Sequence, residues 1–320
     1  MAIANAPTQT TPDTHPAPRS GPSVRGRILA GIVRLVIKRW PRKSPESVLR
    51  WSRLLFDLPS FLSVGRTRGL TLTQVNEDGV RGEWLTPVGL SPHILLFLHG
   101  GGYVSCSPRS HRPITGTLAR LLKQRVFSLD QRLAPEHPFP AAVDDASAAY
   151  QWLLKKGTRP DQISLAGDSA GGGLVVATLL RLHRENVPLP SCAVCLCPWV
   201  DLTGTFAYRN GDSCAMFRPS DISNFAGLYL NGAPAETPEA SPLFGDLTGL
   251  PPLLIQVSSS ELLFDDARRL HEKAGQCGVK SKLSAYPGLP HVWHLAVGLI
   301  PEALAALREE AEFIRGEQKP

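Results

Sequence analysis

The chain has 320 residues, of which 42% are hydrophobic, and its formal net charge is +6. The charge is concentrated in residues 1–53, where ten Lys or Arg residues stand against Asp13 and Glu46, a local +8 that leaves about −2 (6 − 8) for the rest. The main part of the chain therefore lacks the net positive charge that is typical of a nucleic-acid-binding protein. The sequence contains no run of about 18 apolar residues, so we predict no transmembrane helix.

Residues 1–24 are rich in Pro, Thr and Ala and contain no apolar run, so we predict a disordered tail that is not a secretory signal peptide. We therefore expect a cytoplasmic protein whose thiols are reduced. Cys192 and Cys195 have Cys-x-x-Cys spacing, but they lie with Cys197 in an apolar run typical of a buried strand, and no paired histidines accompany them, so we predict no metal site. The cysteines of the chain are Cys106, Cys192, Cys195, Cys197, Cys214 and Cys277.

Two helices are predicted next, and we assign residues 25–68 to an N-terminal helical cap. Residues 25–40 form an amphipathic helix that ends at Pro41, and residues 45–55 form a second helix with Ser44 as its cap. The apolar stripe of the first helix suits two roles. It could bind a lipid surface, because another face is basic, but we expect it to pack against protein, which is what apolar stripes usually do.

From residue 69 to residue 320 the pattern alternates between strands and helices. Residues 69–76 and 80–87 predict a hairpin, and the alternation beyond it predicts an α/β fold with a mostly parallel, doubly wound sheet. Residues 201–250, rich in Gly, Pro, Ser and Asn, interrupt the pattern and predict a cap insertion. The remaining strands are expected at 93–99, 125–130, 162–166, 192–198, 252–257 and 282–286, and the helices at 114–123, 141–155, 172–185, 265–277 and 301–315.

The strongest motif is Gly167-Asp168-Ser169-Ala170-Gly171, which lies between a predicted strand and a predicted helix. Strand, Gly-x-Ser-x-Gly and helix in this order predict a nucleophile elbow, a sharp turn that presents the serine hydroxyl at the strand tip. Ser169 is therefore our candidate nucleophile.

A glycine-rich loop, residues 99–103, follows the predicted strand at 93–99. It lacks the Lys-Ser/Thr of a phosphate-binding loop and the spacing of a dinucleotide-binding loop. Beside a nucleophile elbow, we predict an oxyanion hole formed by the N–H groups of Gly100, Gly101 and Ala170.

A nucleophilic serine needs a base and an acid, which on a fold of this kind follow it in the order acid, then histidine. Glu261 follows the strand at 252–257, and His291 follows the last strand. Asp265 and Asp266 are alternative acids, although each would begin the following helix. His294 competes with His291, but it would lie about one helical turn further on.

These motifs resemble the hormone-sensitive-lipase-like (bacterial family IV) carboxylesterases of the α/β-hydrolase superfamily. The resemblance covers roughly residues 70–300 and includes the segment 132–142, for which we predict a structural role. It implies an eight-stranded, mostly parallel sheet flanked by helices, with a helical cap. It also implies a Ser169–His291–Glu261 triad. The chain departs from the family by carrying Glu261 in place of a common Asp, Cys106 in place of Gly and Gln131 in place of Tyr.

The resemblance implies a serine carboxylesterase that acts on esters of short to medium acyl chains, through an acyl-enzyme and without a cofactor. The same triad would also serve a lactonase, a thioesterase or an amidase. A non-catalytic ligand receptor on this fold is the remaining alternative, and the presence of His291 argues against it. The expected partner is a small ester, without nucleic-acid or membrane contact, and an exposed last strand leaves a homodimer open.

Overall fold

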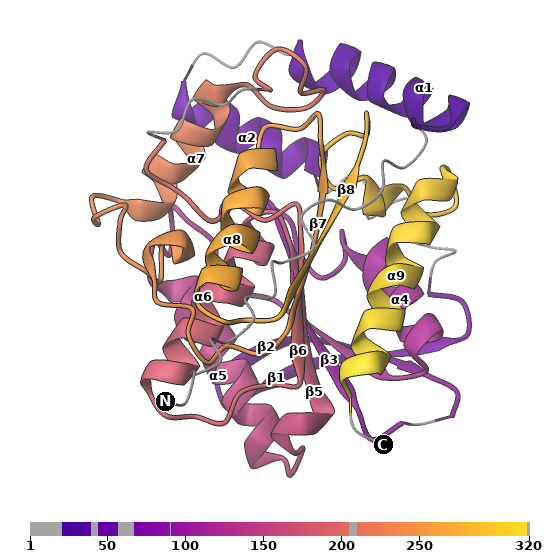
Figure 1. The fold of residues 1–320 in the computed structure, drawn as a ribbon, viewed down its shortest axis with the longest axis vertical. Helices are drawn as coiled ribbons and strands as arrows, with labels where there is room; N and C mark the ends of the chain where they lie inside the picture. The colour runs from indigo at the N-terminus through magenta and orange to yellow at the C-terminus, as the bar shows by residue number, and fades with distance from the viewer. Residues whose placement is uncertain (1–20, 40–43, 57–66, 90, 205–209, 319–320) are drawn as a thin grey trace, which may run out of the picture.

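The computed structural model describes residues 21–39, 44–56, 67–89, 91–204 and 210–318. Most of the predicted tail, residues 1–20, lies outside the described residues. The chain folds around one eight-stranded sheet with helices on both sides, as Figure 1 shows. This confirms the predicted α/β fold.

The sheet has the strand order β1-β2-β4-β3-β5-β6-β7-β8. β1 and β2 form the predicted antiparallel hairpin, β2 also pairs antiparallel with β4, and all later pairs are parallel. The strands that are buried on both faces are continuous apolar runs, as parallel strands require. The strands are β1 (Leu70–Glu77), β2 (Val80–Pro87), β3 (Ile94–Leu98), β4 (Arg125–Leu129), β5 (Ile163–Asp168), β6 (Cys192–Leu196), β7 (Leu253–Ser258) and β8 (Ser281–Tyr286).

Among the described residues, five helices cover the two faces of the sheet and bury a hydrophobic core on each. α4 and α9 lie on one face, and α5, α6 and α8 lie on the other (Figure 1). Each follows a strand, as the sequence alternation predicted. Their bounds are α4 (Arg112–Leu122), α5 (Ala141–Lys155), α6 (Ala170–Arg184), α8 (Phe264–Gln276) and α9 (Pro301–Glu317).

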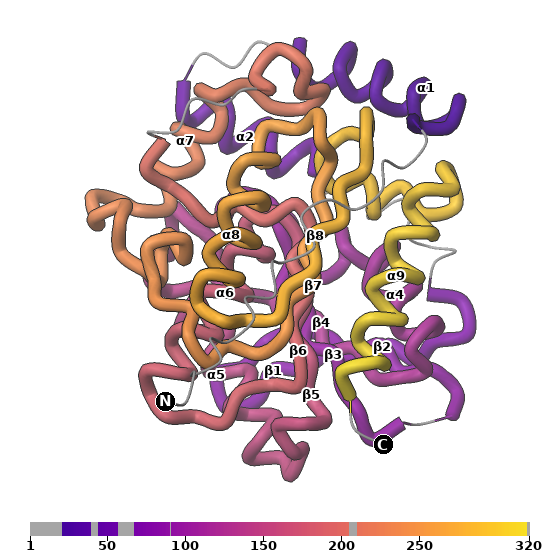
Figure 2. Tube along the Cα trace, in the orientation of Figure 1, coloured from indigo at the N-terminus to yellow at the C-terminus, as the bar shows by residue number. Residues whose placement is uncertain are grey.

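A cap lies at one end of the sheet, where Figure 2 shows the indigo α1 and α2 beside the orange α7. α1 (Val24–Val33) continues into a π-helical turn, η1 (Arg34–Lys38), so the predicted helix at 25–40 changes its winding within its last third. α2 (Pro45–Phe56) contacts α7 (Pro219–Leu230), which belongs to the predicted insertion at 201–250.

Side chains of the N-terminal segment, Lys38 and Arg53 among them, hold the cap in place. Lys38 donates to the carbonyl oxygens of Gly211 and Cys214, both at 2.8 Å. Arg53 of α2 donates to the carbonyl oxygens of Val104 at 2.9 Å and Ala134 at 3.1 Å, and it pairs with Glu136. The cap is therefore tied to the segments that follow β3 and β4.

Within the described residues, no helix has both the length and the apolar character needed to cross a membrane.

Candidate active site

Ser169 lies at the sharp turn between β5 and α6, where its backbone has φ 55° and ψ −123°. A positive φ is strained for any residue other than glycine. The flanking glycines make the turn possible. A Cβ at Gly167 would lie 2.4 Å from the Gly171 carbonyl oxygen, and one at Gly171 would lie 2.1 Å from the Leu98 carbonyl oxygen. The predicted strand–turn–helix geometry around Ser169 is therefore present.

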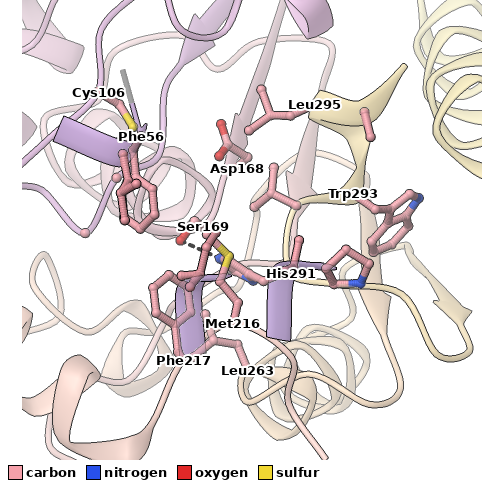
Figure 3. A pocket seen from close by; sticks show the side chains of 18 of the residues that line it. Phe56, Cys106, Asp168, Ser169, Met216, Phe217, Leu263, His291, Trp293 and Leu295 are labelled. Carbon is pink, nitrogen blue, oxygen red and sulfur yellow. Dashed lines mark hydrogen bonds between the residues drawn. The ribbon is translucent and has the colours of Figure 1, made fainter. Parts of the chain in front are cut away.

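His291 connects Ser169 to Glu261. Its Nε2 lies 2.8 Å from Ser169 Oγ, and its Nδ1 lies 3.1 Å from Glu261 Oε1. Figure 3 shows His291 directed at Ser169 across the pocket. The three residues follow β5, β7 and β8, whose carboxyl ends meet at one edge of the sheet. All three are buried, with exposed fractions of 9% for Ser169, 7% for His291 and 1% for Glu261.

The alternative acids are engaged elsewhere. Asp266 accepts the N–H groups of Val200 and Asp201 at 3.0 and 3.1 Å, and burial raises the pKa of its carboxyl to about 7. Asp265 pairs with Arg268 on its own helix at 3.4 Å. The structure therefore brings His291 together with Glu261, the acid preferred from the sequence.

The competing histidine, His294, is fully buried beneath the site. Its Nε2 lies 3.0 Å from Gln256 Oε1, and its ring stacks on Trp293. Burial lowers the pKa of His294 to about 3, so its ring is neutral at physiological pH. These contacts make it a packing residue.

The glycine loop differs from the prediction at one donor. The Gly100 N–H donates to Asp168 Oδ1 at 3.1 Å, so it is already engaged, and its assignment to the oxyanion hole was wrong. Gly101 and Gly102 line the pocket beside Ser169. Within the described part of the chain, neither of their N–H groups has an acceptor. The Ala170 N–H belongs to the first turn of α6, where backbone donors lack intrahelical partners.

Asp168 organises the loop from the other side of the elbow. Besides the Gly100 N–H, it accepts His111 Nε2 at 3.1 Å. Burial raises the pKa of the Asp168 carboxyl, but the charge and hydrogen bond of His111 and the Gly100 N–H outweigh burial, so the pKa is below its ordinary value. His99 Nδ1 donates to the Gly100 carbonyl oxygen at 2.8 Å. Burial lowers the pKa of His99 to about 4, which keeps its ring neutral.

Two of the three departures from the family motif are found at the loop that follows β3: Cys106 belongs to this loop, and Gln131, which follows β4, contacts it. Gln131 Nε2 donates to the His99 carbonyl oxygen at 2.8 Å and so supports the loop. Cys106 has φ 73°, is partly buried and lines the pocket.

Cys197 is a site neighbour that sequence reasoning missed. Its thiol, a Glu261 carboxylate oxygen and a His291 ring nitrogen lie within 4.8 Å of one another. Burial raises the pKa of the Cys197 thiol well above its ordinary range, and the Glu261 carboxylate beside it raises it further. A protonated thiol is a hydrogen-bond donor and not a metal ligand. Both His291 nitrogens are also engaged, so this cluster fits a hydrogen-bonded network better than a metal site.

A cavity of about 250 Å³ lies against Ser169 and His291, and its walls are mostly apolar. Residues of both predicted cap segments contribute to it, including Leu29 and Val33 before the sheet. Met216 and Phe217 come from the insertion (Figure 3). The arrangement combines a hydroxyl, an imidazole, a carboxylate and backbone donors beside an apolar cavity, which is the chemical equipment for acyl transfer.

Comparison with known proteins agrees with this chemistry. Residues 95–295 match the family described as alpha/beta hydrolase fold. An acetyl-hydrolase of Streptomyces hygroscopicus is 43% identical over 235 residues, which cover 73% of this chain and 79% of the relative. The carboxylesterase/phospholipase LipF of Mycobacterium tuberculosis is 35% identical over 92% of this chain and 83% of its own.

Solved structures extend the similarity to nearly the whole chain. The crystal structure of an esterase from the bacterial hormone-sensitive lipase family superposes with a TM-score of 0.85 at 38% identity, covering 94% of this chain and all of the other. This chain therefore belongs to the α/β-hydrolase fold family and, within it, to the carboxylic ester hydrolases of the hormone-sensitive lipase type.

Proposed function

We propose that Ser169, His291 and Glu261 form the catalytic triad of a serine esterase for small carboxylic esters. The observation that carries this proposal is the position of His291, whose two ring nitrogens contact Ser169 Oγ at 2.8 Å and Glu261 Oε1 at 3.1 Å. A base that contacts the nucleophile and is oriented by an acid is the geometry that activates a serine hydroxyl.

In the first half of the reaction, Ser169 Oγ attacks the ester carbonyl carbon while His291 Nε2 takes the hydroxyl proton. The proton on His291 Nδ1 stays with the ring and is held by Glu261, which stabilises the imidazolium. When the carbon–oxygen bond of the ester breaks, His291 passes the proton to the leaving alkoxide, and the alcohol departs. The acyl group remains on Ser169.

The second half repeats these steps with water. His291 takes a proton from the water, whose oxygen attacks the acyl carbon, and then returns the proton to Ser169 Oγ as the acid leaves. The negative charge that develops on the carbonyl oxygen would be stabilised by the N–H groups of Gly101, Gly102 and Ala170. Each such donor contributes about 2.7–4 kcal/mol of transition-state stabilisation.

The dimensions of the pocket favour a small acyl group. Its volume of about 250 Å³ lies below the usual range of ligand pockets, roughly 300–1,000 Å³. The names of similar proteins, an acetyl-hydrolase and a carboxylesterase/phospholipase, also favour an ester substrate. We therefore expect short to medium acyl chains.

The test is the Ser169→Ala variant assayed on p-nitrophenyl esters of increasing chain length. We expect hydrolysis to fall by about three orders of magnitude or more, and the wild type to show an optimum at short chains. With the wild type, an initial burst of p-nitrophenol equal in concentration to the enzyme would support an acyl-enzyme intermediate on Ser169. Unchanged turnover in Ser169→Ala would refute the mechanism. A parallel panel of lactones, thioesters and amides separates the esterase from the other acyl hydrolases.

A further inference from the structure

The helix formed by α1 and η1 is apolar on two faces. Leu29, Val33 and Ile37 point inward and line the pocket. A second row of large apolar side chains is 47–62% exposed on the outer side of the molecule, where Figure 1 shows α1. These residues, the outer row, are Val24, Ile28, Ile32, Leu35 and Val36. Packing on the protein explains the inner face only, so the outer row needs a different partner.

The charge of this segment indicates the chemistry of the partner. Residues 21–39 contain five Lys or Arg residues and no Asp or Glu. Arg34 and Lys38 donate to backbone carbonyls of the insertion, including that of Asp212, whereas Arg25, Arg27 and Arg39 are exposed. An exposed apolar row accompanied by cations matches an amphipathic helix that lies on an anionic lipid surface.

The outer row is also adjacent to the wall of the active-site pocket. Leu299 is 51% exposed and lines the same pocket as Leu29. The apolar lining of the pocket therefore continues to the protein surface next to α1. A surface that contacted the outer row would lie close to this rim.

We propose that the outer row of α1 and η1 binds the surface of anionic lipid, with Arg25 and Arg27 close to the headgroups. This reverses the expectation, drawn from the sequence, that the membrane is not a partner. A second copy of the chain is a poorer occupant, because pairing two such helices would bring like charges together without an acid in either segment. The binding does not depend on the proposed esterase activity.

The test measures vesicle binding by flotation, with the full chain carrying Ser169→Ala so that no hydrolysis occurs. The vesicles contain either equal parts of phosphatidylglycerol and phosphatidylcholine or phosphatidylcholine alone. We expect binding to the anionic vesicles that weakens by about tenfold or more on phosphatidylcholine alone, and again in Ile28→Ser/Ile32→Ser. Val88→Ser is the control, because Val88 is 92% exposed just beyond the end of β2, and this variant should bind as the parent does.

Three results would overturn the proposal. One is the absence of binding to anionic vesicles, and another is equal binding by Ile28→Ser/Ile32→Ser and the parent. The third is a dimer in analytical ultracentrifugation that these two substitutions abolish, because a second copy would then occupy the outer row. The same substitutions with Ser169 intact should leave the melting temperature and the hydrolysis of soluble p-nitrophenyl acetate unchanged, which shows that the fold survives.

Discussion

Replacing Glu310 with glutamine is expected to stabilise the protein at neutral pH. Glu310 lies on α9 and is fully buried, and neither of its carboxylate oxygens has a hydrogen-bond partner within the described residues. α9 packs against β6, the buried strand that carries Cys192 and Cys195. Burial raises the pKa of the Glu310 carboxyl from 4.5 to about 8.

The direction of this effect follows from the protonation of Glu310 in the folded and in the unfolded chain. Below pH 4.5 the carboxyl is protonated in both the folded and the unfolded chain, so it does not oppose folding. Between pH 4.5 and about 8 the unfolded chain loses the proton while the folded chain keeps it, which lowers the free energy of unfolding. Each pH unit above 4.5 lowers the free energy of unfolding by about 1.36 kcal/mol, so the reduction reaches about 4 kcal/mol at pH 7.5.

Glutamine has nearly the same shape but does not ionise, so Glu310→Gln should remove this loss. Urea unfolding at about pH 5 and about pH 7.5 should show a small difference between the variant and wild type at the lower pH and about 4 kcal/mol at the higher. Glu312→Gln on the same helix, at an exposed position, should show no such change. If Glu310→Gln changed the free energy of unfolding equally at both pH values, the reasoning would be refuted, because the carboxyl of Glu310 would then have the same pKa in the folded and the unfolded chain.

Three further predictions concern the site. Glu261→Gln should reduce kcat by about two to four orders of magnitude while Asp265→Asn changes it less than threefold or so, and the opposite order in ester assays would assign the acid to Asp265. Asp168→Asn weakens the acceptor of the Gly100 N–H, so kcat should fall about tenfold or more with little change in KM. A change in KM alone would contradict a role of Asp168 in ordering the glycine loop. Cys197→Val removes the thiol beside Glu261 and should lower kcat, whereas Cys197→Ser should preserve it, and equal rates for both variants would show that the thiol donor is dispensable.

The sheet and its helices could be predicted because each signal lies within one short segment. The strands at the centre of the sheet are unbroken apolar runs, and the loop Asp78–Gly79 between β1 and β2 carries turn chemistry that needs no distant partner. The elbow at Ser169 was predictable for the same reason, since both required glycines lie within two residues of the serine.

The features that could not be predicted depend on contacts between distant segments. Whether the Gly100 N–H is free depends on Asp168, which lies 68 positions away in the chain. Cys197 resembles any other cysteine of a buried strand until the fold brings it beside Glu261. Likewise, the stripe of residues 25–40 predicted one apolar face, and only the packed structure divides it into a lining for the pocket and an exposed row.

The contacts of Arg53 connect the width of the pocket to the chemistry within it. Its guanidinium is a rigid planar group that spans from α2 to the carbonyl of Val104, two residues beyond Gly102. Leu55 and Phe56 of α2 line the cavity, so an acyl chain too long for it would push α2 outward, and the displacement would pull on the segment whose N–H groups we propose as oxyanion donors. Oversized esters would then be discriminated against through turnover as well as through affinity, so that one side chain couples the tolerance of the cap to the rate of acyl transfer.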